Sequence, residues 1–169
     1  MKLRTLVINA IIAGIYATVS IVILPLSFGA LQFRIGEMLN HLIVFDKGYF
    51  FGIIVGVFIA NLFSAFGLID VVFGVLHTAL ALGLTTLAAR FIKTRWKLML
   101  FNSFIFSALM WIIALVIMAG GSFSIEVFFI TWAGLFFTEF LVMTLAIPLW
   151  QSMNSRPIMN FLSTIQSVF

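Results

Sequence analysis

Long apolar runs separated by short polar breaks make up most of this chain. A helix needs about 20 apolar residues to cross a bilayer, and five runs reach that length: Leu6–Leu24, Phe50–Leu68, Val71–Ala89, Leu98–Ala119 and Val127–Trp150. The breaks between them include Pro25, Asp70 and Gly120-Gly121-Ser122. A shorter and more polar segment, Leu31–Phe45, predicts one further helix, tilted or shielded from lipid. The pattern therefore predicts an all-α integral membrane protein with six transmembrane helices, folded as a single domain over residues 1–169.

The placement of charge predicts how these helices are oriented. Only 8% of the residues are charged, whereas 64% are hydrophobic. With the N-terminus in the cytoplasm, eight of the nine basic residues fall on the inner side: Lys2, Arg4, Lys47, Arg90, Lys93, Arg95, Lys97 and Arg156. The positive-inside rule thus predicts an N-in, C-in multi-pass membrane protein. Arg34 is the exception, on the outer half.

Several kinds of chemistry are excluded by what the sequence lacks. There is no Cys, which removes disulfides and thiolate chemistry, and no G-x-x-x-x-G-K-[ST] nucleotide loop. The basic residues form no patch interleaved with aromatics, which argues against a nucleic-acid partner. The first apolar run is longer than the core of a signal peptide, so we expect a retained helix. We predict no catalytic residue, metal site or cofactor, and any uphill transport would take its energy from a partner.

A cluster of polar residues in the second predicted helix is the first candidate site. Arg34, Glu37 and His41 are spaced i, i+3, i+7, which places them within about 60° of one another on an α-helix. Gln32 and Asn40 lie beside them in the sequence. Charge within a bilayer is costly and usually marks a pathway or a binding site. This face is therefore predicted to be one wall of a ligand cavity, the alternative being an internal Arg34–Glu37 ion pair that orients the helix.

Two later helices carry further candidates. Asp70 and His77 share a face, with Gly74 between them allowing a ligand or a helix to approach closely; Asp70 also suits an N-cap, and His77 a hydrogen-bonded core position. Glu139 falls near the middle of the last apolar run and needs a partner, for which Arg34 is available. Trp132 lies seven residues before Glu139 and offers an aromatic plate for a flat ligand.

Two other patterns leave alternatives open. Small residues on the first helix form a smooth patch that suits packing within the chain or docking of a partner subunit: Ala10, Ala13, Gly14 and Ala17. His41 and His77 lie at similar predicted depths, so a membrane haem or redox subunit is a remote alternative. A structural subunit without a ligand is another.

These residues also carry a resemblance to a known family. The chain resembles the substrate-binding S components of energy-coupling-factor (ECF) ABC importers, in the queuosine-precursor-transporter branch. The likeness covers most of the chain and is most specific in three segments: Leu31–Glu37, Ala60-Asn61-Leu62 and Gly67–Gly74. Ala13-Gly14-Ile15-Tyr16-Ala17 looks like the patch by which such components dock on their coupling subunit.

The resemblance implies a six-helix binder of a vitamin-like small molecule, working with a transmembrane coupling subunit and two ATPases. The ligand would lie in the outer half. Gly36 stands where many relatives have serine, which removes a hydroxyl or widens the pocket. On that widening, and because some relatives in lactic-acid bacteria are associated with cobalamin, the expected ligand is cobalamin. The alternative is a queuosine precursor of 7-deazaguanine type, whose guanine-like edge suits Glu37 or Glu139 and whose aminomethyl cation suits an acidic face.

Overall fold

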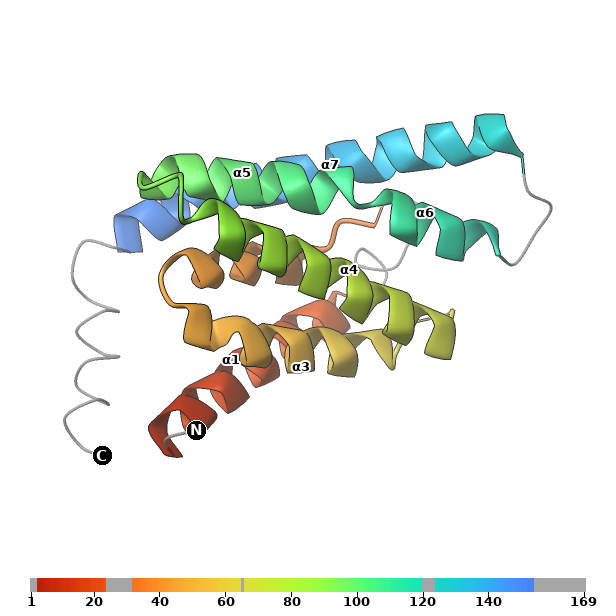
Figure 1. Cartoon of the computed structure of the whole chain (residues 1–169). Helices are drawn as coiled ribbons and strands as arrows, with labels where there is room; N and C mark the ends of the chain where they lie inside the picture. Colours follow the sequence, from red (N-terminus) through yellow and green to blue (C-terminus); the bar gives the residue numbers. More distant parts are fainter. Residues whose placement is uncertain (1–2, 24–31, 65, 120–123, 154–169) are drawn as a thin grey trace.

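The protein is an all-helical bundle in a computed structural model, which describes residues 3–23, 32–64, 66–119 and 124–153 (Figure 1). The helices in chain order are α1 (Leu3–Val22), η1 (Ile35–Val44), η2 (Lys47–Tyr49), α3 (Phe50–Asn61), α4 (Leu68–Ala88), α5 (Arg95–Ala108), α6 (Trp111–Met118) and α7 (Ile125–Met153). Four segments of the described chain are long and apolar enough to cross a membrane: Leu3–Val22, Leu68–Ala88, Arg95–Met118 and Ile125–Ser152.

Three of the expected helices differ from the prediction. The second is not an α-helix but a 3₁₀-helix of ten residues, η1, and the third ends at Asn61 rather than Leu68. The run predicted as one helix over Leu98–Ala119 is divided into α5 and α6 by a turn at Leu109 and Met110. Hydropathy cannot reveal that turn, because the residues around it are as apolar as the helices on either side.

Close packing of α1 on α3 depends on two glycines of α3. A Cβ atom added at Gly52 would lie 2.8 Å from the backbone oxygen of Asn9, and one added at Gly56 would lie 2.7 Å from Cβ of Tyr16. The Asn9 side chain accepts a hydrogen bond from the Gly52 N–H and donates to the Gly48 carbonyl at 2.9 Å. Small residues at an interface allow membrane helices to approach closely, and here they belong to α3 and face α1.

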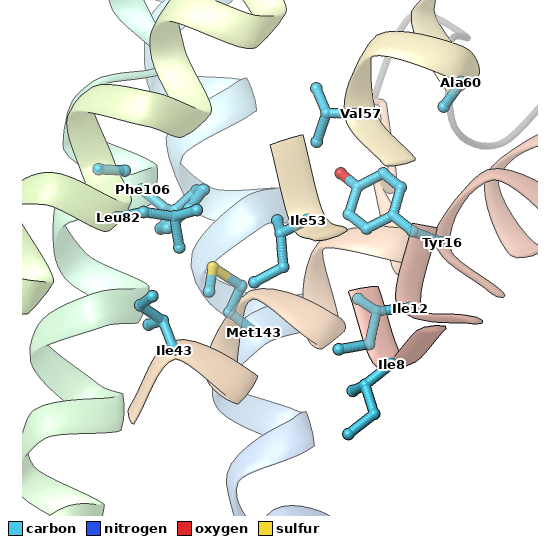
Figure 2. Close-up of a cluster of buried hydrophobic side chains, with 11 residues drawn as sticks. Ile8, Ile12, Tyr16, Ile43, Ile53, Val57, Ala60, Leu82, Phe106 and Met143 are labelled. Carbon is cyan, nitrogen blue, oxygen red and sulfur yellow. The ribbon is translucent and has the colours of Figure 1, made fainter. Parts of the chain in front are cut away.

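The main hydrophobic core joins α1, η1 and the helices that follow. Figure 2 shows side chains of α1, α3, α4, α5 and α7 converging on this region, with the Tyr16 ring directed away from α1 into the bundle. Its buried members are Ile8, Ile12, Tyr16, Ile43, Ile53, Val57, Ala60, Ala81, Leu82, Phe106 and Met143. The core surrounds η1, so a short polar helix is enclosed by the longer apolar ones.

One end of the bundle gathers the basic segments. In Figure 1 the start of α1, the α4–α5 connection and the end of α7 lie at the same end of the molecule. The described basic residues other than Arg34 belong to the start of α1, η2, the α4–α5 connection and the first turn of α5: Arg4, Lys47, Arg90, Lys93, Arg95 and Lys97. The fold thus brings together charges that are distant in sequence.

Candidate functional site

The second helix begins with a strained backbone and an ion pair. Gln32 is buried. Its φ of 40° is a left-handed conformation that residues other than glycine seldom adopt. Two residues later, Arg34 occupies the N-cap position of η1. Its Nε lies 2.8 Å from Oε1 of Glu37, and both side chains are buried. The predicted Arg34–Glu37 pair is therefore present, enclosed within the bundle.

The 3₁₀ geometry of η1 changes which residues share a face. With three residues per turn, positions i and i+3 align, whereas i+7 falls about 120° away. Glu37 and Asn40 consequently lie on the side of Arg34, and Asn40 Nδ2 donates a hydrogen bond to Glu37 Oε2 at 3.1 Å. His41 does not share this face, in contrast to the expectation from α-helical spacing. Asn40, which the sequence marked only as a neighbour of this group, lies on the face where His41 was expected.

Three other helices bring polar groups to the Arg34–Glu37 pair. Tyr16 of α1 and Glu139 of α7 interact electrostatically with both Arg34 and Glu37. From α4, His77 interacts with the same pair and Asp70 interacts with Arg34. We call these residues the polar cluster: Tyr16, Arg34, Glu37, Asn40, Asp70, His77 and Glu139. All of its side chains are buried, so residues far apart in the sequence meet in one enclosed region.

Several atoms of the polar cluster have no hydrogen-bond partner among the described residues. They are Arg34 Nη1, Asn40 Oδ1, His77 Nδ1, and both carboxylate oxygens of Glu139. His77 Nε2 must donate to the Phe106 carbonyl, 2.9 Å away, because a carbonyl only accepts. In a neutral imidazole, Nδ1 is then an acceptor. Buried polar atoms are normally satisfied, so this combination of donor and acceptors is what a polar ligand would complete.

His41 is occupied by the protein itself. Its Nε2 lies 2.9 Å from the Met143 carbonyl, and its Nδ1 accepts from Asn102 Nδ2 at 3.2 Å. Asn102 also accepts from the Thr85 hydroxyl at 2.7 Å. Both ring nitrogens are therefore used in joining η1 to α5 and α7. The remote haem alternative needed a free nitrogen on His41 and gains no support here.

Trp132 likewise has a structural partner. Its indole N–H donates to the Ala108 carbonyl at 3.2 Å, and its ring stacks on Phe128 with centroids 6.4 Å apart. The turn between α5 and α6 directs the Ile112 N–H to Leu109 instead of Ala108. Trp132 on α7 thus satisfies a carbonyl that the turn leaves open, as His77 does for Phe106.

The packing of the helices decides three expectations, two about glycines and one about a helix cap. A Cβ at Gly36 would collide with the Ser20 hydroxyl oxygen of α1, so the space is already filled and the expected widening of the pocket is wrong. Gly74 accommodates the side chain of Asn61, which means that a helix rather than a ligand approaches it. Asp70 is not the N-cap of α4, because Gly67 holds that position with φ of 63°. Asp70 is instead buried in the first turn.

The small residues of α1 point in two directions. Ala13 and Ala17 are buried, and Ala13 packs beneath Gly56 of α3. Ala10 and Gly14 are exposed, and no atom lies within 4 Å of a Cβ added at Gly14. The predicted patch therefore divides into an internal half and an outward half, and only the outward half is open to another subunit.

Tyr16 was not singled out in the sequence. A single tyrosine in an apolar helix resembles an ordinary core residue, and its neighbours Ala13 and Ala17 drew attention as a docking patch instead. The available signal was the spacing of Tyr16 and Ser20, which are one helical turn apart and share the buried face of α1.

Known proteins give this polar cluster a context. The family described as QueT transporter matches residues 6–155. The chain belongs to the QueT transporter family. Within it, the queuosine precursor transporter QueT of Lactococcus lactis subsp. cremoris (strain MG1363) is 32% identical over 145 residues, which cover 82% of this chain and 85% of that relative. No solved structure matches the chain. QueT membership confirms the resemblance to queuosine-precursor transporters and identifies a multi-pass protein of the cell membrane with a transport role.

Proposed function

We propose that this protein is the substrate-binding component of an importer for a queuosine precursor of 7-deazaguanine type. The observation that carries the proposal is the buried Glu139 carboxyl group, whose oxygens accept no hydrogen bond from the described residues and which lies within hydrogen-bonding reach of Glu37. A charged group within a membrane bundle marks a functional site. The relative named as a queuosine precursor transporter supports this ligand class.

The unpartnered atoms match the edge of a 7-deazaguanine. That edge presents two adjacent N–H donors, at N1 and the 2-amino group, beside a carbonyl acceptor. The two free oxygens of Glu139 would accept the donors as a bidentate pair, and Arg34 Nη1 would donate to the carbonyl. His77 Nδ1 is a further acceptor for a ring N–H. Such a site rejects analogues that lack a donor, because its own polar atoms then remain unpaired.

The relative described above is named for a queuosine precursor, and the structural reason for preferring cobalamin is absent. That preference depended on extra room at Gly36, where Ser20 of α1 already lies. The alternative ligand of the sequence analysis is thus the one that both the polar cluster and the relative favour.

Transport needs further subunits, and we extend the proposal to them. In an ECF arrangement the coupling subunit and two ATPases supply the energy, which agrees with a sequence that has no nucleotide loop. The exposed Ala10 and Gly14 of α1 are the residues of the predicted patch that remain available for docking. We propose an N-in, C-in arrangement of six membrane-crossing segments, in which η1 and the Lys47–Asn61 segment are the two short ones.

Thermal unfolding of the purified protein tests the ligand and its site. A ligand at 100 times its Kd stabilises by about 2.7 kcal/mol, so a 7-deazaguanine precursor should raise the unfolding temperature, whereas cobalamin, riboflavin and folate should not. Glu139→Gln keeps the shape of the side chain but replaces one acceptor by a donor, and should abolish the increase. Glu126→Gln is the matched control, since Glu126 is exposed on the same helix. An undiminished shift with Glu139→Gln, or a shift with cobalamin alone, would contradict the proposal.

A further inference from the structure

An apolar groove lies at the basic end of the molecule, on other residues than the polar cluster. It has a volume of about 340 Å³ and is lined by the last turns of α4, the α4–α5 connection and α5: Leu84, Leu87, Ala88, Phe91, Ile92 and Phe101. Phe91 lies three residues after the end of α4 at Ala88 and is 80% exposed. The groove is therefore accessible from outside the bundle at Phe91.

Basic residues lie next to the groove residues in the sequence, and no acidic residue lies among them. The segment Arg90–Lys97, which is the α4–α5 connection and the first residues of α5, contains Arg90, Lys93, Arg95 and Lys97 and no Asp or Glu. Lys93 Nζ donates to the Ala89 carbonyl at 3.4 Å, which keeps its ammonium group at the end of α4. Lys97 Nζ lies 5.6 Å from the centre of the Trp96 ring. Trp96 is itself exposed, as is typical of an aromatic residue at the boundary between lipid tails and headgroups.

The two features together are complementary to one kind of molecule. An apolar groove receives a hydrocarbon chain, and basic residues beside a membrane helix attract anionic headgroups. A soluble anion would contact only the basic residues, and a neutral lipid only the groove. We propose that the groove binds an acyl chain of an anionic phospholipid whose phosphate pairs with Arg90, Lys93 and Lys97.

Native mass spectrometry of the purified protein in detergent tests the proposal with short-chain lipids. Dioctanoyl phosphatidylglycerol should bind at a lower concentration than dioctanoyl phosphatidylcholine, and glycerol phosphate should not bind. Each removed basic residue should weaken phosphatidylglycerol binding roughly fivefold. Lys93→Gln with Lys97→Gln is the charge variant, and Lys47→Gln, a basic residue at the same end but outside the groove, is its control.

A second variant tests the apolar half independently. Ala88→Phe places a ring in the groove and should weaken both lipids, whereas Leu80→Phe, exposed on α4 outside the lining, should weaken neither. Equal binding of the two lipids, or an equal loss with Lys47→Gln, would overturn the proposal. So would a lipid-free dimer that Ala88→Phe disrupts, because a second copy of the chain would then cover the groove.

Discussion

Gly36 determines how closely η1 approaches α1 beside the polar cluster. The position of its missing Cβ is occupied by the Ser20 hydroxyl oxygen, and the nearest carbon of the Tyr16 ring is 3.4 Å away. Glu37 follows directly in the chain, so the spacing of these two helices also sets the position of the Glu37 carboxylate. A single absent methyl group thus couples the packing of α1 to the geometry of the Arg34–Glu37 ion pair.

Gly36→Ala should destabilise the protein by about 1–3 kcal/mol, the usual cost of overpacking a filled interior. Ser20→Ala removes the colliding oxygen, so the double variant should recover most of the loss. Chemical unfolding in mixed micelles of the two single variants and the double variant measures this coupling. If the losses simply add, the contact between positions 20 and 36 is not what limits the size of residue 36.

At the level of elements, α3 packs on α1 through one face of small residues. Gly52 and Gly56 are one turn apart, and both approach α1 at distances that leave no room for a Cβ atom. Two of the three atoms nearest to the added Cβ at Gly52 are backbone atoms of Asn9, which cannot move aside as a side chain can. Gly83 on α4 is different, because no atom lies within 4 Å of its added Cβ.

Alanine substitutions at Gly52 and Gly83 should therefore have different effects on the free energy of unfolding. Gly52→Ala should lower the free energy of unfolding by about 1–3 kcal/mol through overpacking. Gly83→Ala should leave it unchanged or raise it by up to about 1 kcal/mol, because alanine favours the helix over glycine. Thermal unfolding of both variants under identical conditions provides the comparison. A loss at Gly83 equal to that at Gly52 would show that the contact with α1 is not what makes Gly52 sensitive to an added methyl group.

The sequence predicted the elements better than their internal geometry. Apolar runs located α1, α4 and α7 to within about three residues at each described end, because burial in lipid demands them. The charges of Arg34, Glu37 and Glu139 marked the cluster, because charge within a bilayer is costly. Hydropathy has no signal for 3₁₀ rather than α geometry, however, so His41 was placed on the face that Asn40 occupies. Nor does it show that a tryptophan suited to a ligand serves a backbone carbonyl.

For the whole molecule, the basic end and the polar cluster define a direction across the membrane. The start of α1, η2, the α4–α5 connection and the first turn of α5 carry the described basic residues other than Arg34. From the positive-inside rule we expect this end to lie in the cytoplasm. The end of α6 and the start of α7 lie at the other end (Figure 1), so we expect them to face outward.

Single cysteines test this orientation cleanly, because the chain has none of its own. Thr94→Cys in the α4–α5 connection should react with a membrane-impermeant maleimide only after the cells are opened. Ile125→Cys at the start of α7 should react in intact cells, since the side chain is exposed. Labelling of Thr94→Cys in intact cells would reverse the proposed topology, and the pair of variants controls for reagent access.

Glu139 links the stability of the protein to the binding of the proposed ligand. A buried carboxyl group that lies beside Glu37 and accepts no hydrogen bond from the described residues lowers the stability of the empty protein. The same group is the one that we assign to the ligand. Functional sites often carry such a trade-off. A screen for heat resistance without ligand would therefore enrich exchanges at position 139 and select proteins that no longer bind. Stabilised variants for crystallisation or cryo-electron microscopy should be selected with a precursor present, and with Glu139 held constant.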